Sequence, residues 1–418
     1  MRPRAWAFKV AGDVRDSYWF VPGLLALSCL SAGFGLVWAD AALGDRWLGR
    51  YDWFYGSRPE GARAVLSAIG SSTITVAGVV FSITLAAVTY ASGQYGPRLL
   101  GDFARDRGNQ VTLGVFVGTF LYCLVVLRTI RSAEETSAET GGAVRDAFVP
   151  QLAVLGALGL AVASIAVLIW FVHHVTDSIH INSLIARVGR GLLRDVARRR
   201  DERGEPAQPP RPPGPDAWTC PAPTTGYVRS IDEEDLLATA GRHGARITAL
   251  AGPGDFVHRG RPLLLVKGAR TPELEAVAGA FVIGRKRSAD QDLRFPVDEL
   301  VEIAARALSP GVNDPFTAVA CIDWLGAALS DLDRLPALGG TRVGEDGRGA
   351  LTLPTLGFPE FLEAAAGRLR PYAARDPIAG PRLLATLETV AAGSADAAHR
   401  ALIDEEAARL RAATKENG

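Results

Sequence analysis

The sequence predicts an α-helical polytopic membrane protein with four transmembrane helices, followed by a cytoplasmic α+β C-terminal domain. Charge is unevenly distributed: residues 1–173 carry 14 basic and 12 acidic side chains, and the remainder of the 418 carry 31 and 33. Long uncharged windows interrupt the first part, and the mean hydropathy of the chain is +0.14. These features and the net charge of +0 exclude a uniformly soluble globule, a disordered chain and a strongly basic nucleic-acid binder.

The uncharged windows are long enough to cross a bilayer as helices. Each has about twenty residues or more, and the hydrocarbon core of a bilayer is about 30 Å thick. Trp19 and Trp38 bracket the first window and Trp170 marks the end of the fourth, where interfacial aromatic residues gather. We therefore expect spans near residues 19–39, 66–91, 110–128 and 149–173.

The flanking charges predict the orientation. Basic residues dominate the N-terminal arm (1–18), the loop after the second span and the segment after the fourth. The 132–146 loop has three glutamates against one arginine, although four arginines in the 40–63 loop weaken the bias. By the positive-inside rule, both termini are expected in the cytoplasm.

Small and hydroxyl residues recur along the second span at alternating steps of four and three, which places them on one helix face. They are Ser71, Thr75, Gly78, Ser82, Leu85, Thr89 and Ser92. One interpretation is a tight helix–helix seam within a subunit. The other is the pore-lining face of a homo-oligomer, in which Leu85 forms a hydrophobic constriction. Apart from Arg128 at the end of the third, no span contains a charged residue, which argues against a carrier built on buried carboxylates.

Glycine and proline punctuate the membrane part in two places. Gly93, Gly96 and Pro97 follow the second span, where they predict either a helix stop or the hinge of a gate. In the third span, Gly114 and Gly118 form a GxxxG pattern, which we interpret as helix packing.

An amphipathic helix and a proline-rich linker are expected over residues 179–216. Apolar residues recur at helical spacing from Ile181 to Val196, with arginines on the other faces, so this helix is expected to lie against anionic headgroups or to pack on a partner helix. The proline-rich run 206–215 then ends the helical pattern.

Two modules are expected after the linker. Residues 217–295 form a small β-rich module with strands at 225–232, 245–250 and 262–267 and a helix at 233–242. Residues 296–418 form a mainly helical C-terminal module. Its expected elements are a helix at 296–308, a hairpin around 345–347, and helices near 358–373, 377–392 and 395–413.

Four polar residues around the 296–308 helix are candidates for a ligand or cation site, because carboxylate and amide oxygens suit that role. They are Asp290, Asp292, Asn313 and Asp314. The alternative is a helix–turn–helix corner that needs these residues for geometry, since Asp314 before Pro315 is a good N-cap with proline at the first helical position.

Reaction signatures are absent from the sequence. It contains no GxxxxGK[ST], GxGxxG after a strand, GxSxG or HExxH motif, so no catalytic residue is assigned and no cofactor is expected. The four cysteines lack metal-binding spacing and are interpreted as reduced thiols. His173, Asp177 and His180 share a helix face, but with no further ligand evident we interpret the histidines as interfacial and expect no metal.

Three stretches resemble the hallmark sequences of a bacterial predicted membrane-protein family, catalogued as domain of unknown function 2254. They are residues 91–100 (ASGQYGPRLL), 114–122 (GVFVGTFLY) and 307–318 (ALSPGVNDPFTA). The resemblance spans most of the chain and implies a multi-pass protein of the bacterial inner (plasma) membrane with a cytoplasmic C-terminal part. It implies no activity.

Two functions from different classes follow. The leading hypothesis is a homo-oligomeric, channel-like protein regulated by its cytoplasmic domain, because the hydroxyl stripe lies next to a large domain able to bind a small ligand. The alternative is a membrane-anchored sensor or scaffold whose cytoplasmic domain binds a protein partner without transport. A membrane enzyme ranks third. The expected partners are the lipid bilayer and further copies of the chain, and no nucleic acid.

Overall fold

The computed structural model describes residues 17–43, 58–95, 106–131, 148–201, 216–344 and 347–417. The chain forms two compact units, of which the first ends at His180 and the second begins at Ile181. We call them the N-terminal and C-terminal units. Most of the predicted N-terminal arm, most of the proline-rich linker, and the residues Gly96 and Pro97 lie outside the described residues.

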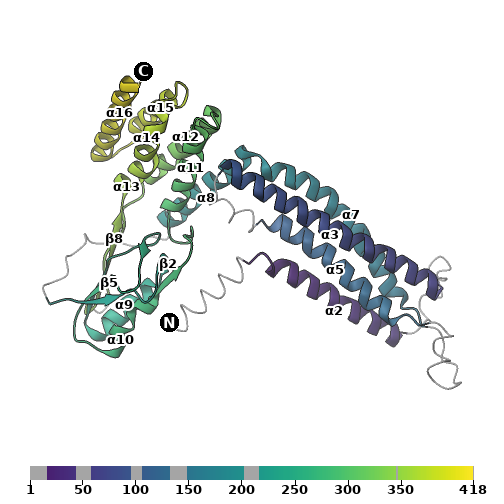
Figure 1. Cartoon of the computed structure of the whole chain (residues 1–418). Coiled ribbons are helices and arrows are strands. Elements are labelled where there is room, and N and C mark those ends of the chain that lie inside the picture. The colour runs from purple at the N-terminus through teal and green to yellow at the C-terminus, as the bar shows by residue number, and fades with distance from the viewer. Residues whose placement is uncertain are drawn as a thin grey trace. The chain divides into compact units, whose positions relative to one another are not determined.

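Four long helices make up the described part of the N-terminal unit and lie side by side (Figure 1). They are α2 (Phe20–Leu43), α3 (Pro59–Tyr95), α5 (Arg107–Thr129) and α7 (Gln151–Ile179). Each is long and apolar enough to cross a membrane, which confirms the prediction of four helices able to span a bilayer. Helix α5 packs against the other three and is the most buried of them.

The two glycines of the third span let α2 and α5 approach closely. A Cβ atom added to Gly114 would lie 2.7 Å from Cδ1 of Leu25 and 3.0 Å from the Cα of Pro22. At Gly118 it would lie 2.8 Å from the Sγ of Cys29. The prediction that the GxxxG pattern serves helix packing is therefore confirmed.

An acidic side chain from α2 completes the beginning of α7. The residue that precedes α7, Pro150, offers no side-chain acceptor to the first turn. Instead, the carboxylate of Asp40 accepts hydrogen bonds from the backbone N–H groups of Leu152, at 3.1 Å, and Ala153, at 3.0 Å. A negative charge there also interacts favourably with the positive end of the helix dipole. Asp40 thus fixes the end of α2 to the start of α7.

The C-terminal unit contains two small sheets. The larger has the order β1-β5-β3-β8-β7, and the smaller β4-β2-β6. The strands are β1 (Trp218–Pro221), β2 (Gly226–Ile231), β3 (Arg246–Ala249), β4 (Phe256–Val257), β5 (Pro262–Lys267), β6 (Phe281–Gly284), β7 (Leu338–Val343) and β8 (Ala350–Leu356). All neighbouring pairs are antiparallel except β3 and β8, which are parallel.

The predicted C-terminal hairpin is present as β7 and β8, and it does not stand alone. Strand β8 joins the edge of β3, with Ile247 opposite Leu351. These two side chains belong to one apolar core, in which Leu264 and Val266 of β5 are completely buried. Residues about a hundred positions apart in the sequence therefore share one sheet, and the α+β character of this unit is confirmed.

Helices surround and extend these sheets (Figure 1). They are α8 (Ile181–Asp201), α9 (Glu233–His243), α10 (Pro272–Glu275), α11 (Arg294–Ala307), α12 (Pro315–Leu332), α13 (Phe358–Leu362), α14 (Arg368–Ala373), α15 (Ala379–Gly393) and α16 (Ala397–Asn417). A π-helical turn at Glu363–Gly367 links α13 to α14. Helix α8 packs its apolar face on α11 and α12, which was one of the two expectations for it.

Candidate functional sites

The predicted stripe of the second span lies on the exposed side of α3. Its members from Ser71 to Thr89 are all exposed, and Leu85 is 56% exposed. The side chain of Ser92 lies outside the description. The face that packs on α5 and α7 is a different one, made by residues such as Thr73, Val80 and Thr84. At 100° per residue the two faces are separated by about 150°. The stripe is therefore not a seam within one subunit.

The described hydroxyl groups of the stripe donate hydrogen bonds to backbone carbonyls of the helix that carries them. The Thr75 hydroxyl donates to the carbonyl of Ser71 at 2.7 Å, and the Thr89 hydroxyl donates to the carbonyl of Leu85 at 2.9 Å. The Ser82 hydroxyl makes the same bond to the carbonyl of Gly78 at 2.9 Å. Such bonds let a hydroxyl face lipid, another helix or water without leaving a donor unpaired.

Large apolar side chains are exposed on the other helices of the N-terminal unit and also on α3 beside the stripe, where Val79, Phe81 and Ile83 are exposed. Helix α7 exposes large apolar side chains, among them Val162, Ile165 and Ile169, and α2 likewise exposes Leu27 and Phe34. Large apolar surfaces of this kind suit contact with acyl chains. The exposed stripe of α3 is made mainly of small and hydroxyl residues, which is the composition of a close helix–helix contact or of a wetted surface.

The predicted hinge is described only in part. Gly93 lies within α3, which continues without a break to Tyr95, past the expected end at residue 91. The helix stop expected from Gly93 is therefore displaced toward the C-terminus. Gly96 and Pro97 lie outside the described residues, so a hinge there stays a prediction.

Sequence reasoning missed an acid–histidine contact at the start of α5. Asp106 accepts a hydrogen bond from the backbone N–H of Gly108 at 2.8 Å and so caps the helix. Both carboxylate oxygens also contact Nε2 of His174, at 2.9 and 3.0 Å, and the His174 ring stacks on Trp170. A Cβ at Gly108 would overlap the imidazole. This contact holds α5 and α7 together, whereas the predicted residues His173, Asp177 and His180 are all exposed.

Asp292, one of the ligand-site candidates, belongs to a buried ion cluster. Arg287 donates from Nε and Nη2 to Oδ2 of Asp292, at 2.9 and 2.6 Å, and from Nη1 to Oδ2 of Asp298 at 2.6 Å. Arg368 of α14 donates to Oδ1 of the same Asp298 at 2.6 Å. Asp292 is 1% exposed, so its carboxylate is committed to the fold. The cluster joins the segment before α11 to α11 and α14.

Electrostatics within the cluster follow from burial and charge. Removal from water raises the pKa of Asp292, although Arg287 and Arg294 act in the opposite direction. Burial opposes the charge of Arg287 as well, but the two carboxylates outweigh it and raise the pKa of this guanidinium. Gly254 has a φ of +90°, and a Cβ at this position would overlap the Asp292 carboxylate. The turn of the β-module that contains Gly254 therefore packs directly against the cluster.

The four ligand-site candidates do not come together. Asp290 is largely exposed and lies 3.6 Å from the guanidinium of Arg229, while Asp292 belongs to the cluster before α11. Asn313 and Asp314 follow the far end of α11, a helix of 14 residues. Such a helix is about 21 Å long. The four residues therefore do not form one site. A ligand role stays a prediction for Asp290 with Asp292 and for Asn313 with Asp314.

The turn between α11 and α12 uses its polar residues for geometry. Asn313 adopts a left-handed conformation with φ of 50°, which asparagine tolerates. The Asp314 carboxylate accepts hydrogen bonds from the backbone N–H of Thr317, at 3.1 Å, and from its hydroxyl, at 2.6 Å. Pro315 occupies the first helical position. The expected N-cap is confirmed.

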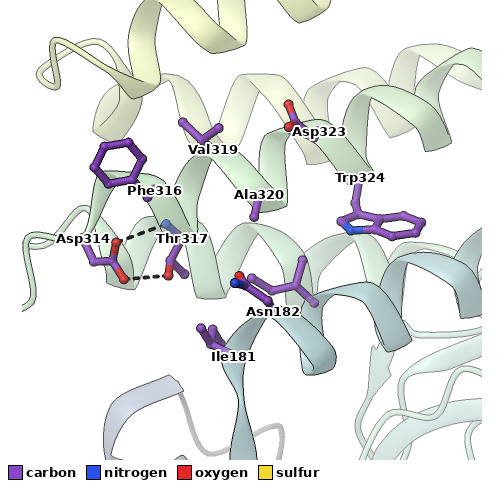
Figure 2. Close-up of a pocket in the computed structure, with 10 residues that line it drawn as sticks. Ile181, Asn182, Asp314, Phe316, Thr317, Val319, Ala320, Asp323 and Trp324 are labelled. Atoms are coloured by element: carbon purple, nitrogen blue, oxygen red, sulfur yellow. Dashed lines mark hydrogen bonds between the residues drawn. The ribbon is translucent and has the colours of Figure 1, made fainter. Parts of the chain in front are cut away.

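An open groove, which no sequence motif predicts, lies beside this turn between α8 and α12. Its volume is about 530 Å³. Figure 2 shows the first turn of α8 opposite the first half of α12. Its lining comprises Ile181, Asn182, Ile185, Asp314, Phe316, Thr317, Val319, Ala320, Asp323 and Trp324. Phe316 is 72% exposed, and Asp323 accepts a hydrogen bond from Arg382 at 2.6 Å. The groove thus combines an exposed aromatic ring with a paired carboxylate.

Potential metal ligands and thiols are scattered in the part of the chain that the structure describes. Within it, no three or more histidine, cysteine, aspartate or glutamate residues are grouped so as to hold a metal ion. All four cysteines are free. Burial raises the pKa of the Cys220 and Cys321 thiols, which disfavours the reactive thiolate.

Comparison with known proteins is consistent with this architecture. A family described as predicted membrane protein (DUF2254) matches residues 15–389. Uncharacterized proteins of Mycobacterium bovis and Mycobacterium tuberculosis are 34% identical over 371 residues, which cover 86% of this chain and 69% of each relative. No solved structure matches. With four apolar helices and a match over most of its length, the chain belongs to the DUF2254 family of predicted membrane proteins.

Proposed function

We propose that the protein is a homo-oligomeric, channel-like protein of the bacterial inner membrane, with both termini in the cytoplasm and with its C-terminal unit as the regulatory part. The observation that carries this proposal is the exposed stripe of α3. Its small and hydroxyl residues face away from their own bundle and lie between exposed apolar residues of the same helix such as Val79 and Phe81. Copies arranged around an axis would bring these stripes together, with Leu85 at the narrowest point.

Planar-bilayer recording of the purified full-length protein tests the proposal. We expect a measurable conductance and a rise in open probability for Leu85→Ser, because a hydroxyl side chain favours wetting of a hydrophobic constriction. The matched control is Ile83→Ser, since Ile83 is also exposed on α3 but lies off the stripe. The absence of conductance in all three proteins, or an equal gain in both variants, would exclude a pore along the stripe.

A membrane-anchored scaffold is the second candidate, and the groove between α8 and α12 favours it. Phe316 projects from the start of α12 with 72% of its surface exposed, and aromatic rings of this kind often dominate the energy of protein–protein contacts. In this function the C-terminal unit binds a protein partner, and the stripe of α3 faces only lipid or another helix.

Affinity purification of the full-length protein tests the scaffold function. Phe316→Ser is expected to abolish recovery of a specific protein partner, whereas Val343→Ser, at an exposed site on β7, is expected to retain it. Loss of a hot-spot aromatic residue costs about 2 kcal/mol or more of binding free energy. Equal recovery from the two variants would show that the groove is not the docking site.

A further inference from the structure

Helix α8 carries a row of arginines on the side that faces away from the rest of the C-terminal unit. They are Arg187, Arg190, Arg194 and Arg198, and we call this row the basic ridge. At 100° per residue the first three lie within about 60° of one another. Arg190 and Arg194 are exposed, and Arg187 is half-buried. The spacing thus gathers positive charge on one face over about three turns of helix.

The opposite face of α8 is already occupied. Leu184, Ile185 and Leu192 are at most 1% exposed, and α8 packs against α11 and α12. A Cβ at Gly189 would overlap the Trp324 ring, so the glycine allows α8 to lie close to α12. Because its apolar stripe is buried in protein, α8 is not free to insert that stripe into a bilayer as an isolated amphipathic helix does. The outward face of α8 carries the arginines of the basic ridge.

Three of the four arginines of the ridge have no carboxylate partner within the described residues. Arg198 pairs with Asp195 at 3.1 Å. Within the described residues, Arg187, Arg190 and Arg194 have no carboxylate partner, and the Nε of Arg194 donates only to the carbonyl of Arg190 at 3.3 Å. Guanidinium groups in this arrangement suit phosphate oxygens, which they bind through paired N–H donors.

Chain connectivity places the beginning of the ridge close to a bilayer. Helix α7, the fourth span, ends at Ile179, and α8 begins at Ile181. Arg187 follows the end of α7 by eight residues, or about 12 Å of helix. That distance is comparable to the screening length of about 8–10 Å at physiological salt. Arg190 and Arg194 follow at about 16 and 22 Å along the helix, so the whole ridge meets the headgroups where α8 runs along the membrane surface. Clusters of basic residues directly after a span attract anionic headgroups by about 1 kcal/mol for each residue near the surface.

We propose that the basic ridge of α8 binds the phosphate groups of anionic phospholipids at the membrane surface. The complementary charge of the ridge and its direct continuation from a membrane span select this partner. Burial of the apolar face of α8 makes the contact electrostatic, so it depends on lipid charge and weakens as salt is raised.

Lipid binding to the full-length protein in neutral detergent provides the test. Phosphatidylglycerol and phosphatidylcholine are titrated separately and bound lipid is counted by native mass spectrometry. The wild type is expected to prefer phosphatidylglycerol. The double variant Arg190→Glu/Arg194→Glu is expected to weaken phosphatidylglycerol binding by about fivefold for each arginine, and phosphatidylcholine binding not at all. Phosphatidylglycerol binding by the milder variant Arg190→Gln/Arg194→Gln is expected to lie between that of the wild type and that of the double glutamate variant.

The matched control is Arg246→Glu/Arg259→Glu, which makes the same change of charge at exposed sites of the β-module. Its preference for phosphatidylglycerol is expected to equal that of the wild type. The proposal is overturned if the wild type shows no preference, or if the control loses as much as the ridge variants. It is also overturned if the ridge variants keep the full preference for phosphatidylglycerol.

Discussion

Arg287→Ala is expected to lower the free energy of unfolding of the C-terminal unit by about 3–5 kcal/mol, because it leaves two buried carboxylates without their shared cation. Arg287 contacts both Asp292 and Asp298, whose side chains are 1% and 8% exposed. Arg368 remains at Asp298, whereas Asp292 keeps, among the described side chains, only the Nε of Arg294 at 3.8 Å. The measurement is amide hydrogen exchange of the full-length protein at rising urea, read out in the strands of the C-terminal unit.

Arg411→Ala is the matched control for this prediction. Arg411 donates to Glu388 at 2.6 Å, but both side chains are about half exposed, so solvent screens the pair and its removal is expected to change stability little. If the two variants destabilise the unit equally, the buried cluster contributes no more than a surface ion pair. The inference that the cluster joins α11 and α14 to the β-module would then be wrong.

Gly114→Leu is expected to separate α2 from α5 and to lower the stability of the N-terminal unit by about 3 kcal/mol, at the upper end of the cost of overpacking. The added side chain would meet Leu25 and the backbone of Pro22, and backbone atoms yield less readily than a side chain does. The thermal midpoint of the detergent-solubilised protein measures the effect, together with the yield of folded protein.

Gly159→Leu on α7 provides the control for the helix seam. A Cβ at Gly159 meets no atom within 4 Å, and the residue is exposed. Leucine has a higher helix propensity than glycine by about 0.8 kcal/mol, so this variant is expected to be neutral or slightly stabilised. A comparable loss in both variants would indicate a general effect of leucine rather than close packing between α2 and α5.

The membrane part of the fold could be predicted well because the pattern that predicts each helix is local in the sequence. A run of about twenty uncharged apolar residues has few alternatives to a spanning helix, and the GxxxG of the third span carries its own packing rule. The stripe of α3 could be predicted as a face, but its direction could not. Helical spacing does not reveal which face a neighbouring helix covers, and α5 covers the face of Thr73 and Thr84.

The C-terminal unit was predicted less completely because its short strands depend on distant partners. Strand β4 has two residues and β6 has four, and β1 includes a proline, so none has a clear alternating pattern. The candidate carboxylates were identified by type, yet Asp292 faces Arg287 and Asp314 caps α12. Only the folded chain distinguishes a carboxylate that holds the protein together from one that is free to bind a ligand.

The parallel pairing of β3 with β8 affects how the protein is made. Strand β3 acquires β5 soon after synthesis, but its other edge stays open until β8 emerges about a hundred residues later. At a translation rate of about 5–20 residues per second, that edge is exposed for about 5–20 s. An open strand edge is a site for pairing with other chains. Protection of this edge during synthesis therefore becomes a requirement of the fold, and truncation before residue 350 is expected to yield an aggregation-prone product.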